Sequence, residues 1–177
     1  MTEGKNNNFD WLPALLPCDW NAYQETIESA YRVFLRDFGT ETVRPQFRGK
    51  RMGLKRHPEL DGKSATFWHF VTEGNIEADR TPVRARIERI AWPRALLVEA
   101  VQKSSRVLVW ANMRPHQKHR GSTRWLIALP DFSYVVVIDE RDDYVLPWTA
   151  YTVEYEHRRR KMKREYDAWR KAEAEKS

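Results

Sequence analysis

A histidine inside a dense aromatic run is the residue of this sequence best suited to acid–base chemistry. His69 lies within residues 66–70, which read Thr-Phe-Trp-His-Phe, and Glu73 follows four residues later. Burial beside aromatic rings favours the neutral imidazole, whereas a nearby carboxylate favours the protonated form and fixes a tautomer. A histidine held in that balance can exchange a proton near neutral pH. The alternative is a core histidine whose ring is hydrogen-bonded inside the protein.

Groups that suit a phosphate occur at two further places. Guanidinium groups, which bind phosphate through paired N–H donors, are close together in the sequence at Arg80, Arg84, Arg86 and Arg89. In a strand, alternate side chains share a face, so Thr149 and Tyr151 would present two hydroxyls together. The alternatives are arginines that are solvated or paired with Glu88, and hydroxyls on an ordinary solvated strand.

More cations gather in one short segment and one loop. Residues 43–56 contain six Lys or Arg and no acid, and glycines at 49 and 53 permit sharp turns. This pattern predicts a short twisted hairpin with a cationic face along which a phosphate backbone could lie, or simply a solvated face. The loop 115–122 is also cationic. His116 and His119 in that loop have a spacing compatible with metal binding, but the loop offers no carboxylate or cysteine, so we expect no metal site.

The elements that would position these groups follow from hydrophobic spacing. From Asp19 to Gly39 apolar residues recur at three and four, which predicts a helix with one buried face and core aromatics. A second helix is expected to start at Thr81-Pro82, with proline in the first turn. The apolar segment Arg94 to Val101 is expected to pack beneath a sheet. Tyr155 to Lys176 reads as a terminal helix with nine basic and five acidic residues.

The sheet itself is predicted from four apolar segments with short polar breaks: Arg106 to Met113, Thr123 to Leu129, Ser133 to Ile138 and Tyr144 to Tyr151. Each segment is rich in β-branched and aromatic residues, and connections this short join antiparallel neighbours. The expected fold class is therefore α+β: an N-terminal helix, the basic hairpin and a second helical segment packed on a four-stranded antiparallel meander, with a basic C-terminal helix.

Length, charge and cysteine content limit the expected domain number, partner and location of the chain. A chain of 177 residues with a formal net charge of +6 suits one domain, expected at 19–177, and an anionic partner. Residues 1–18 are expected to form a poorly ordered arm, although 9–17 has apolar residues that could pack irregularly. Cys18 is the one cysteine, which fits a reducing cytoplasmic location. We expect no signal peptide and no membrane contact, because the sequence has neither a signal-like start nor a long apolar run.

The order of these features resembles phage- and mobile-element-encoded members of the barnase, EndoU, colicin and RelE-like nuclease superfamily. The resemblance covers about residues 45–165 and is carried by Thr-Phe-Trp-His at 66–69, Glu-Gly at 73–74, Arg-Thr-Pro at 80–82, Glu-Arg-Ile at 88–90 with a tryptophan at 92, the four strand segments, and Trp-Thr-Ala-Tyr at 148–151. It implies a helical N-terminal part packed on a four-stranded antiparallel sheet. The sequence departs from the pattern at Thr152, where the family often has proline, and at 83–86, which lacks the expected acid and cysteine.

The resemblance also implies a reaction, which is cleavage of RNA without metal or organic cofactor. Such cleavage needs a base for the 2′-hydroxyl proton, cations for the phosphorane and an acid for the leaving oxygen. The residues expected to act in catalysis are His69, Glu73, Arg89, Thr149 and Tyr151. The residues expected to bind substrate are Arg48, Lys50, Arg51, Arg80, Arg120 and Arg124.

We therefore expect a metal-independent ribonuclease of toxin or effector type, with RNA, including tRNA, as substrate and an immunity or antitoxin protein as a further partner. The alternative is a non-catalytic nucleic-acid-binding protein of a phage or mobile element. A third hypothesis is an interaction protein whose basic surface serves a protein partner. Salt-sensitive binding without cleavage would favour the alternative, and absence of binding to RNA and DNA would favour the third.

Overall fold

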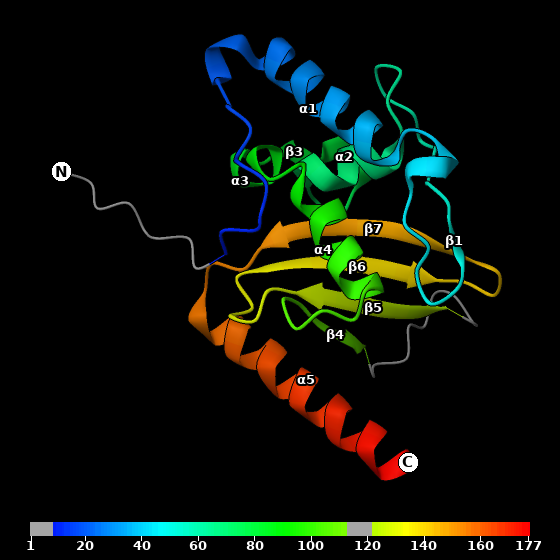
Figure 1. Cartoon of the computed structure of the whole chain (residues 1–177). Helices are drawn as coiled ribbons and strands as arrows, with labels where there is room; N and C mark the ends of the chain where they lie inside the picture. Colours follow the sequence, from blue (N-terminus) through cyan, green and yellow to red (C-terminus); the bar gives the residue numbers. More distant parts are fainter. Residues whose placement is uncertain (1–8, 113–121) are drawn as a thin grey trace.

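A mixed five-stranded sheet separates two unequal layers of helices in the computed structural model, which describes residues 9–112 and 122–177. Helices α1 to α4 lie on one side of the sheet, and the long C-terminal helix α5 lies on the other (Figure 1). A second sheet of two short strands, β2 and β3, lies among the smaller helices. The α+β class predicted from the sequence is confirmed.

The large sheet has the strand order β1-β7-β6-β5-β4. Strands β4 (Leu108–Ala111), β5 (Thr123–Ala128), β6 (Tyr134–Glu140) and β7 (Tyr144–Thr152) pair successively in antiparallel fashion. The short strand β1 (Arg51–Met52) joins β7 in parallel. The sheet is thus mixed and five-stranded, in contrast to the four-stranded antiparallel sheet expected from the sequence.

The helical layer begins with the 3-10 turn η1 (Trp20–Ala22), which leads into α1 (Tyr23–Phe38). Asp19 caps this start, because its side chain accepts a hydrogen bond from the Asn21 amide at 2.9 Å. A second 3-10 turn, η2 (Glu41–Val43), follows α1. The remaining helices of this layer are α2 (Ala65–Val71), α3 (Arg84–Glu88) and α4 (Trp92–Val101).

Two segments differ from their predicted structure. Thr81-Pro82, the expected helix start, forms β3 (Thr81–Pro82), which pairs with β2 (Thr72–Glu73), and η3 (Glu77–Asp79) lies between them. Helix α3 begins only at Arg84, because the 81–82 backbone is engaged in the small sheet. The expected basic hairpin is reduced to a single antiparallel bridge between Phe47 and Lys50, after which the chain joins β7.

The core has two parts that correspond to the two faces of the sheet. The larger part fills the space between the sheet and α1, α2 and α4, with Phe34, Phe67 and Leu96 fully buried. The smaller part, around Trp110, lies beneath α5 (Glu156–Lys176). Residues 9–18 pack against the larger part and do not form a loose arm, because Trp11 and other apolar residues of this stretch find cover there. None of the helices in the described ranges has the length and apolar character needed to cross a membrane.

Candidate nucleic-acid interface

Helix α2 carries His69 to the boundary between the sheet and the helical layer. Ser64 caps the helix, because its Oγ accepts a hydrogen bond from the Phe67 amide at 3.4 Å. Phe67, Phe70 and Val71 are buried in the larger part of the core and fix the helix there. As a result His69 is only 5% exposed.

The ring of His69 is paired with Glu77. Nε2 of His69 lies 2.7 Å from Oε1 of Glu77, and Nζ of Lys55 lies 3.5 Å from the same oxygen. Burial lowers the pKa of His69 below its ordinary value of 6.5, and the hydrogen bond to Glu77 offsets this only in part. The imidazole is therefore mainly neutral at pH 7. Glu73, the carboxylate expected to orient His69, is exposed on β2, and η3 turns Glu77 onto the ring in its place.

Arg86 joins the two predicted hydroxyl residues to the end of α2. Its Nη1 donates to Oγ1 of Thr149 at 3.3 Å and to the His69 carbonyl at 3.2 Å. The Thr149 hydroxyl donates to the same carbonyl at 3.1 Å. The Tyr151 ring lies 5.6 Å from the guanidinium carbon of Arg86. His69, Thr149 and Tyr151 thus meet at one junction, but Thr149 and Arg86 contact the backbone of His69 and not its ring.

Arg80 and Arg89 are engaged within the protein. The Arg80 guanidinium donates to Oγ1 and O of Thr72 at 2.8 and 2.9 Å and to the Gly74 carbonyl at 2.7 Å. Arg89 donates to the Ala85 carbonyl at 3.0 Å and lies 4.9 Å from the Trp92 ring. Both arginines, expected to hold phosphate, instead stabilise their own loop and helix end.

A β-bulge in β7 sets the direction of Trp148. Val137 of β6 pairs with Thr149, whereas the next residue, Ile138, pairs with Pro147, so Trp148 is an extra residue in β7. Bulges bend a strand and redirect a side chain, and proline is tolerated there because its missing N–H costs no ladder hydrogen bond. The simple alternation expected along this strand is therefore interrupted at Trp148.

Two cations from separate parts of the chain lie over the partly exposed ring of Trp148. Nζ of Lys55 lies 5.3 Å and Cζ of Arg124 lies 5.0 Å from its centroid, both within the range of cation–π attraction. The His69 ring meets the same indole edge-on, with centroids 5.6 Å apart and planes at 87°. We call Lys55, His69, Glu77, Arg124 and Trp148 the Trp148 cluster.

Two of the residues expected to bind substrate, Arg48 and Lys50, lie close to a second tryptophan, Trp125, and to Glu140. Cζ of Arg48 lies 4.1 Å from the Trp125 ring, and Nε1 of Trp125 donates to Oε2 of Glu140 at 2.6 Å. Nε of Arg48 and Nζ of Lys50 lie 3.3 and 3.0 Å from the Glu140 carboxylate. We call Arg48, Lys50, Trp125 and Glu140 the Trp125 cluster. The charges of Arg48 and Lys50 are neutralised by Glu140. The sequence had predicted instead that both residues would be free to bind phosphate.

The last two expected substrate-binding residues have different outcomes. Arg51 is exposed on β1, with Nη1 3.9 Å from Glu41 and Cζ 5.8 Å from the Tyr144 ring. Arg120 lies outside the described residues, as do His116 and His119. Arg51 and Arg124 therefore remain as candidates, and the structure adds Lys55 to them.

Sequence reasoning missed Glu77 and the special position of Trp148, and it counted Lys55 only among the six cations of residues 43–56. Glu77 is eight residues beyond His69, a separation that matches neither helical nor strand spacing, so only the turn at η3 brings the two together. One signal was present for Trp148: a proline inside an apparent strand, here Pro147, indicates an edge or a bulge. Comparisons with protein-family models, curated proteins and solved structures found no match, so the nuclease resemblance stays a prediction.

Proposed function

We propose that this protein binds single-stranded RNA, with the Trp148 cluster as a central contact. The observation that carries the proposal is the pairing of two cations, Lys55 and Arg124, with one partly exposed indole. Single strands are bound by cations that hold phosphates together with aromatic rings that stack on unpaired bases. The cluster offers both kinds of group at one point of the surface.

A second cation–aromatic pair extends this surface along β7. Arg51 faces the ring of Tyr144, four residues before Trp148 in the same strand. Because the bulge adds one residue without lengthening the ladder, the two aromatic residues are roughly 10 Å apart, a separation that an extended strand of a few nucleotides can span. The net charge of +6 adds long-range attraction for the phosphate backbone.

Anisotropy of a fluorescein-labelled oligouridine, measured over a range of salt concentrations, tests the proposal. Lys55→Gln and Arg124→Gln each remove one phosphate-binding charge, so each should weaken binding about five- to tenfold and make the salt dependence shallower by about one phosphate contact. Arg32→Gln is the matched control, because it removes the same charge from an exposed position on α1.

The comparison of variants gives clear opposing outcomes. If Lys55→Gln and Arg124→Gln bind as tightly as Arg32→Gln, binding does not use the Trp148 cluster and the proposal fails. It also fails if neither RNA nor DNA binds at low salt. Thermal melting of each variant shows whether a loss of binding reflects a loss of folding.

RNA cleavage is the second candidate function, favoured by the 2.7 Å contact between His69 and Glu77 beside Trp148. A carboxylate that holds Nε2–H leaves Nδ1 as the basic nitrogen, the arrangement that serves a general base. In this scheme Nδ1 of His69 takes the 2′-hydroxyl proton while the 2′ oxygen attacks phosphorus. The bond to the 5′ oxygen breaks, and the Lys55 ammonium protonates that oxygen. Arg124 would stabilise the charged phosphorane.

Incubation of the protein with total RNA and with tRNA in EDTA tests the second candidate. Wild type should release products with 2′,3′-cyclic phosphate ends, and His69→Gln should release none while still binding oligouridine. Absence of products from wild type would leave binding as the function. Products that disappear in EDTA would exclude the metal-free scheme.

A further inference from the structure

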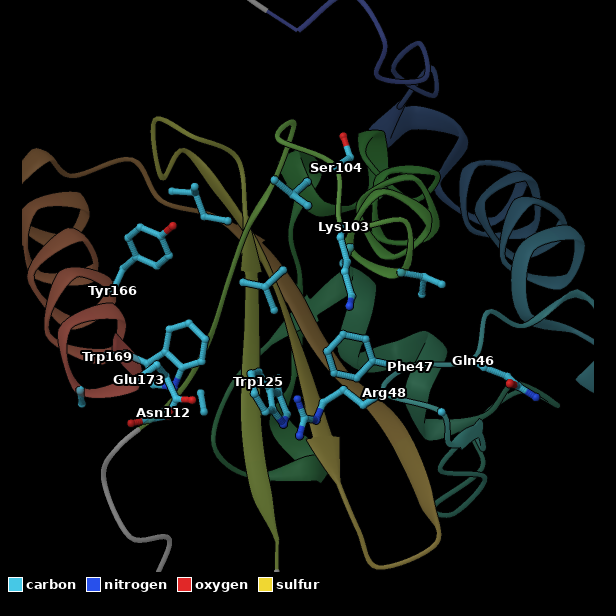
Figure 2. Close-up of a pocket in the computed structure, with 18 of the residues that line it drawn as sticks. Gln46, Phe47, Arg48, Lys103, Ser104, Asn112, Trp125, Tyr166, Trp169 and Glu173 are labelled. Atoms are coloured by element: carbon cyan, nitrogen blue, oxygen red, sulfur yellow. The ribbon is translucent and has the colours of Figure 1, made fainter. Parts of the chain in front are cut away.

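A broad groove lies along the β4 edge of the five-stranded sheet, away from the Trp148 cluster. It has a volume of about 1120 Å³ and follows strand β4, with Val107, Val109 and Ala111 along its base. Figure 2 shows the groove between two walls: Tyr166, Trp169 and Glu173 of α5 on one side, and the 46–49 turn with the end of α4 on the other. The lining is somewhat more apolar than polar, and packed rings form part of its walls.

The backbone of β4 is oriented to accept another strand. The Asn112 amide donates to the Arg124 carbonyl at 2.7 Å, which fixes the phase of the β4–β5 ladder. In an antiparallel ladder alternate residues point their N–H and C=O groups to opposite edges. Leu108 and Trp110 therefore bond to β5, while Val109 and Ala111 direct their backbone groups into the groove. Among the described residues β4 is the outermost strand on this side.

We infer that this groove binds an extended segment of a protein partner by strand addition to β4. The partner segment would have apolar side chains for the two walls and a carboxylate for Lys103. Of the basic residues in the lining, Lys176 is paired with Glu173 at 2.7 Å and Arg48 with Glu140 at 3.3 Å, whereas no ion pair joins Lys103 to a carboxylate of the described residues. Main-chain hydrogen bonds provide affinity in this mode of recognition, and the side-chain pockets provide specificity.

The shape of the groove favours a single strand over other occupants. Pockets for small ligands occupy roughly 300–1,000 Å³, and this groove is larger and open along a strand edge. A second copy of the chain would bring its own β4 together with its own α5. The α5 wall already stands beside β4, where Trp169 contacts Trp125 at a centroid distance of 5.9 Å, so a second copy would bring a second α5 to the same edge.

Selection of linear peptides from a random library against the full chain tests the inference, followed by affinity measurements on the enriched peptides. These should be extended, apolar and acidic. Ala111→Pro removes an outward N–H that the sheet itself does not use, and should weaken them about tenfold. Lys103→Glu should weaken the acidic peptides by a similar factor. Binding should slow amide exchange at Val109.

Peptides methylated at alternate backbone nitrogens keep the test valid if Ala111→Pro does not fold. Methylation of the nitrogens that face β4 should abolish binding, and methylation of the others should not. Lys55→Gln is the matched control, because it should weaken RNA and leave peptide affinity unchanged. The inference is overturned if no peptide is enriched, if both methylation patterns bind alike, or if the chain itself dimerises through β4 in analytical ultracentrifugation.

Discussion

The Trp148 and Trp125 clusters contain the same kinds of residue and differ in what their cations can do. In the Trp125 cluster Glu140 contacts the indole, an arginine and a lysine within 3.3 Å. In the Trp148 cluster the carboxylate, Glu77, is bound to His69 and Lys55. The Arg124 guanidinium carbon lies 5.0 Å from the Trp148 ring, and no ion pair joins Arg124 to a carboxylate of the described residues.

Burial follows the same division. Trp125 is 8% exposed and part of the larger core, whereas Trp148 stays partly open at the bulge. Glu140 satisfies the charges of Arg48 and Lys50 at 3.3 and 3.0 Å, which makes both cations structural. Lys55 lies farther, 3.5 Å, from a carboxylate oxygen that it shares with His69, so its charge is satisfied less completely. A basic residue near an aromatic ring is therefore a candidate for phosphate binding only where no carboxylate is held close to it.

Replacing each tryptophan by alanine should separate the two clusters most strongly. Trp125→Ala removes a buried ring and leaves Glu140 without its indole donor, so the free energy of unfolding should fall by about 3–4 kcal/mol. Trp148→Ala removes a ring that is already partly solvated and should cost about 1–2 kcal/mol. Urea unfolding followed by far-UV circular dichroism measures both values. Equal costs would contradict the distinction between a structural and an exposed ring.

Neutralising Glu140 should make the Trp125 cluster resemble its counterpart. Glu140→Gln leaves Arg48 and Lys50 without their shared charge partner, and a cost of about 1–2 kcal/mol is expected because the site is partly buried. The two released cations should tighten oligouridine binding. Urea unfolding and anisotropy measure the two effects, and Glu156→Gln, at an exposed pair on α5, is the control for the change in net charge. Unchanged stability would show that Glu140 does not hold the cluster together.

The parts of the fold that the sequence predicted are those with a regular period. Helix α1 follows from apolar spacing at three and four, which places Ile27, Ala30 and Phe34 on one buried face. The strands β5, β6 and β7 follow from β-branched runs between turns. Strand β1 has only two residues and pairs with a strand almost a hundred positions away, so no local pattern indicates it.

The candidate site was predictable only in part, because residue type does not reveal the partner. Arg80 and Arg124 are equally plausible phosphate ligands in the sequence. The first is folded back onto Thr72 and Gly74 by the small sheet, and the second crosses to Trp148 because a bulge redirects that ring. Local period predicts neither contact, because each depends on where a distant turn brings the chain.

Replacing Trp148 by a smaller apolar side chain that still fills part of its volume should lower RNA affinity with little loss of stability. Trp148→Leu keeps an apolar side chain at the bulge but removes the aromatic surface for stacking and for the two cations. Binding of oligouridine should weaken about five- to tenfold, as expected for the loss of one base-stacking contact. Anisotropy measures the change, and Trp20→Leu, at an exposed tryptophan near α1, is the matched control. Equal affinities for the two variants would remove Trp148 from the binding surface.

The smallest effect expected is a pH dependence of stability that arises from His69 in the Trp148 cluster. The pKa of His69 is lower in the folded chain than its ordinary 6.5, because burial disfavours the charged ring and the charges of Arg80 and Lys55 act in the same direction, against Glu77. As the pH falls below 6.5, His69 takes up a proton in the unfolded chain before it does so in the folded chain. The contribution of the neutral imidazole to the free energy of unfolding is therefore complete above pH 6.5 and is lost as the pH falls towards the folded pKa. The urea midpoint of wild type should therefore decline between about pH 7.5 and 5.5, and His69→Gln, which can still donate to Glu77, should decline less. The exposed His57→Gln should behave as wild type, and if it flattens the profile as much as His69→Gln does, the pH dependence does not arise from the buried imidazole.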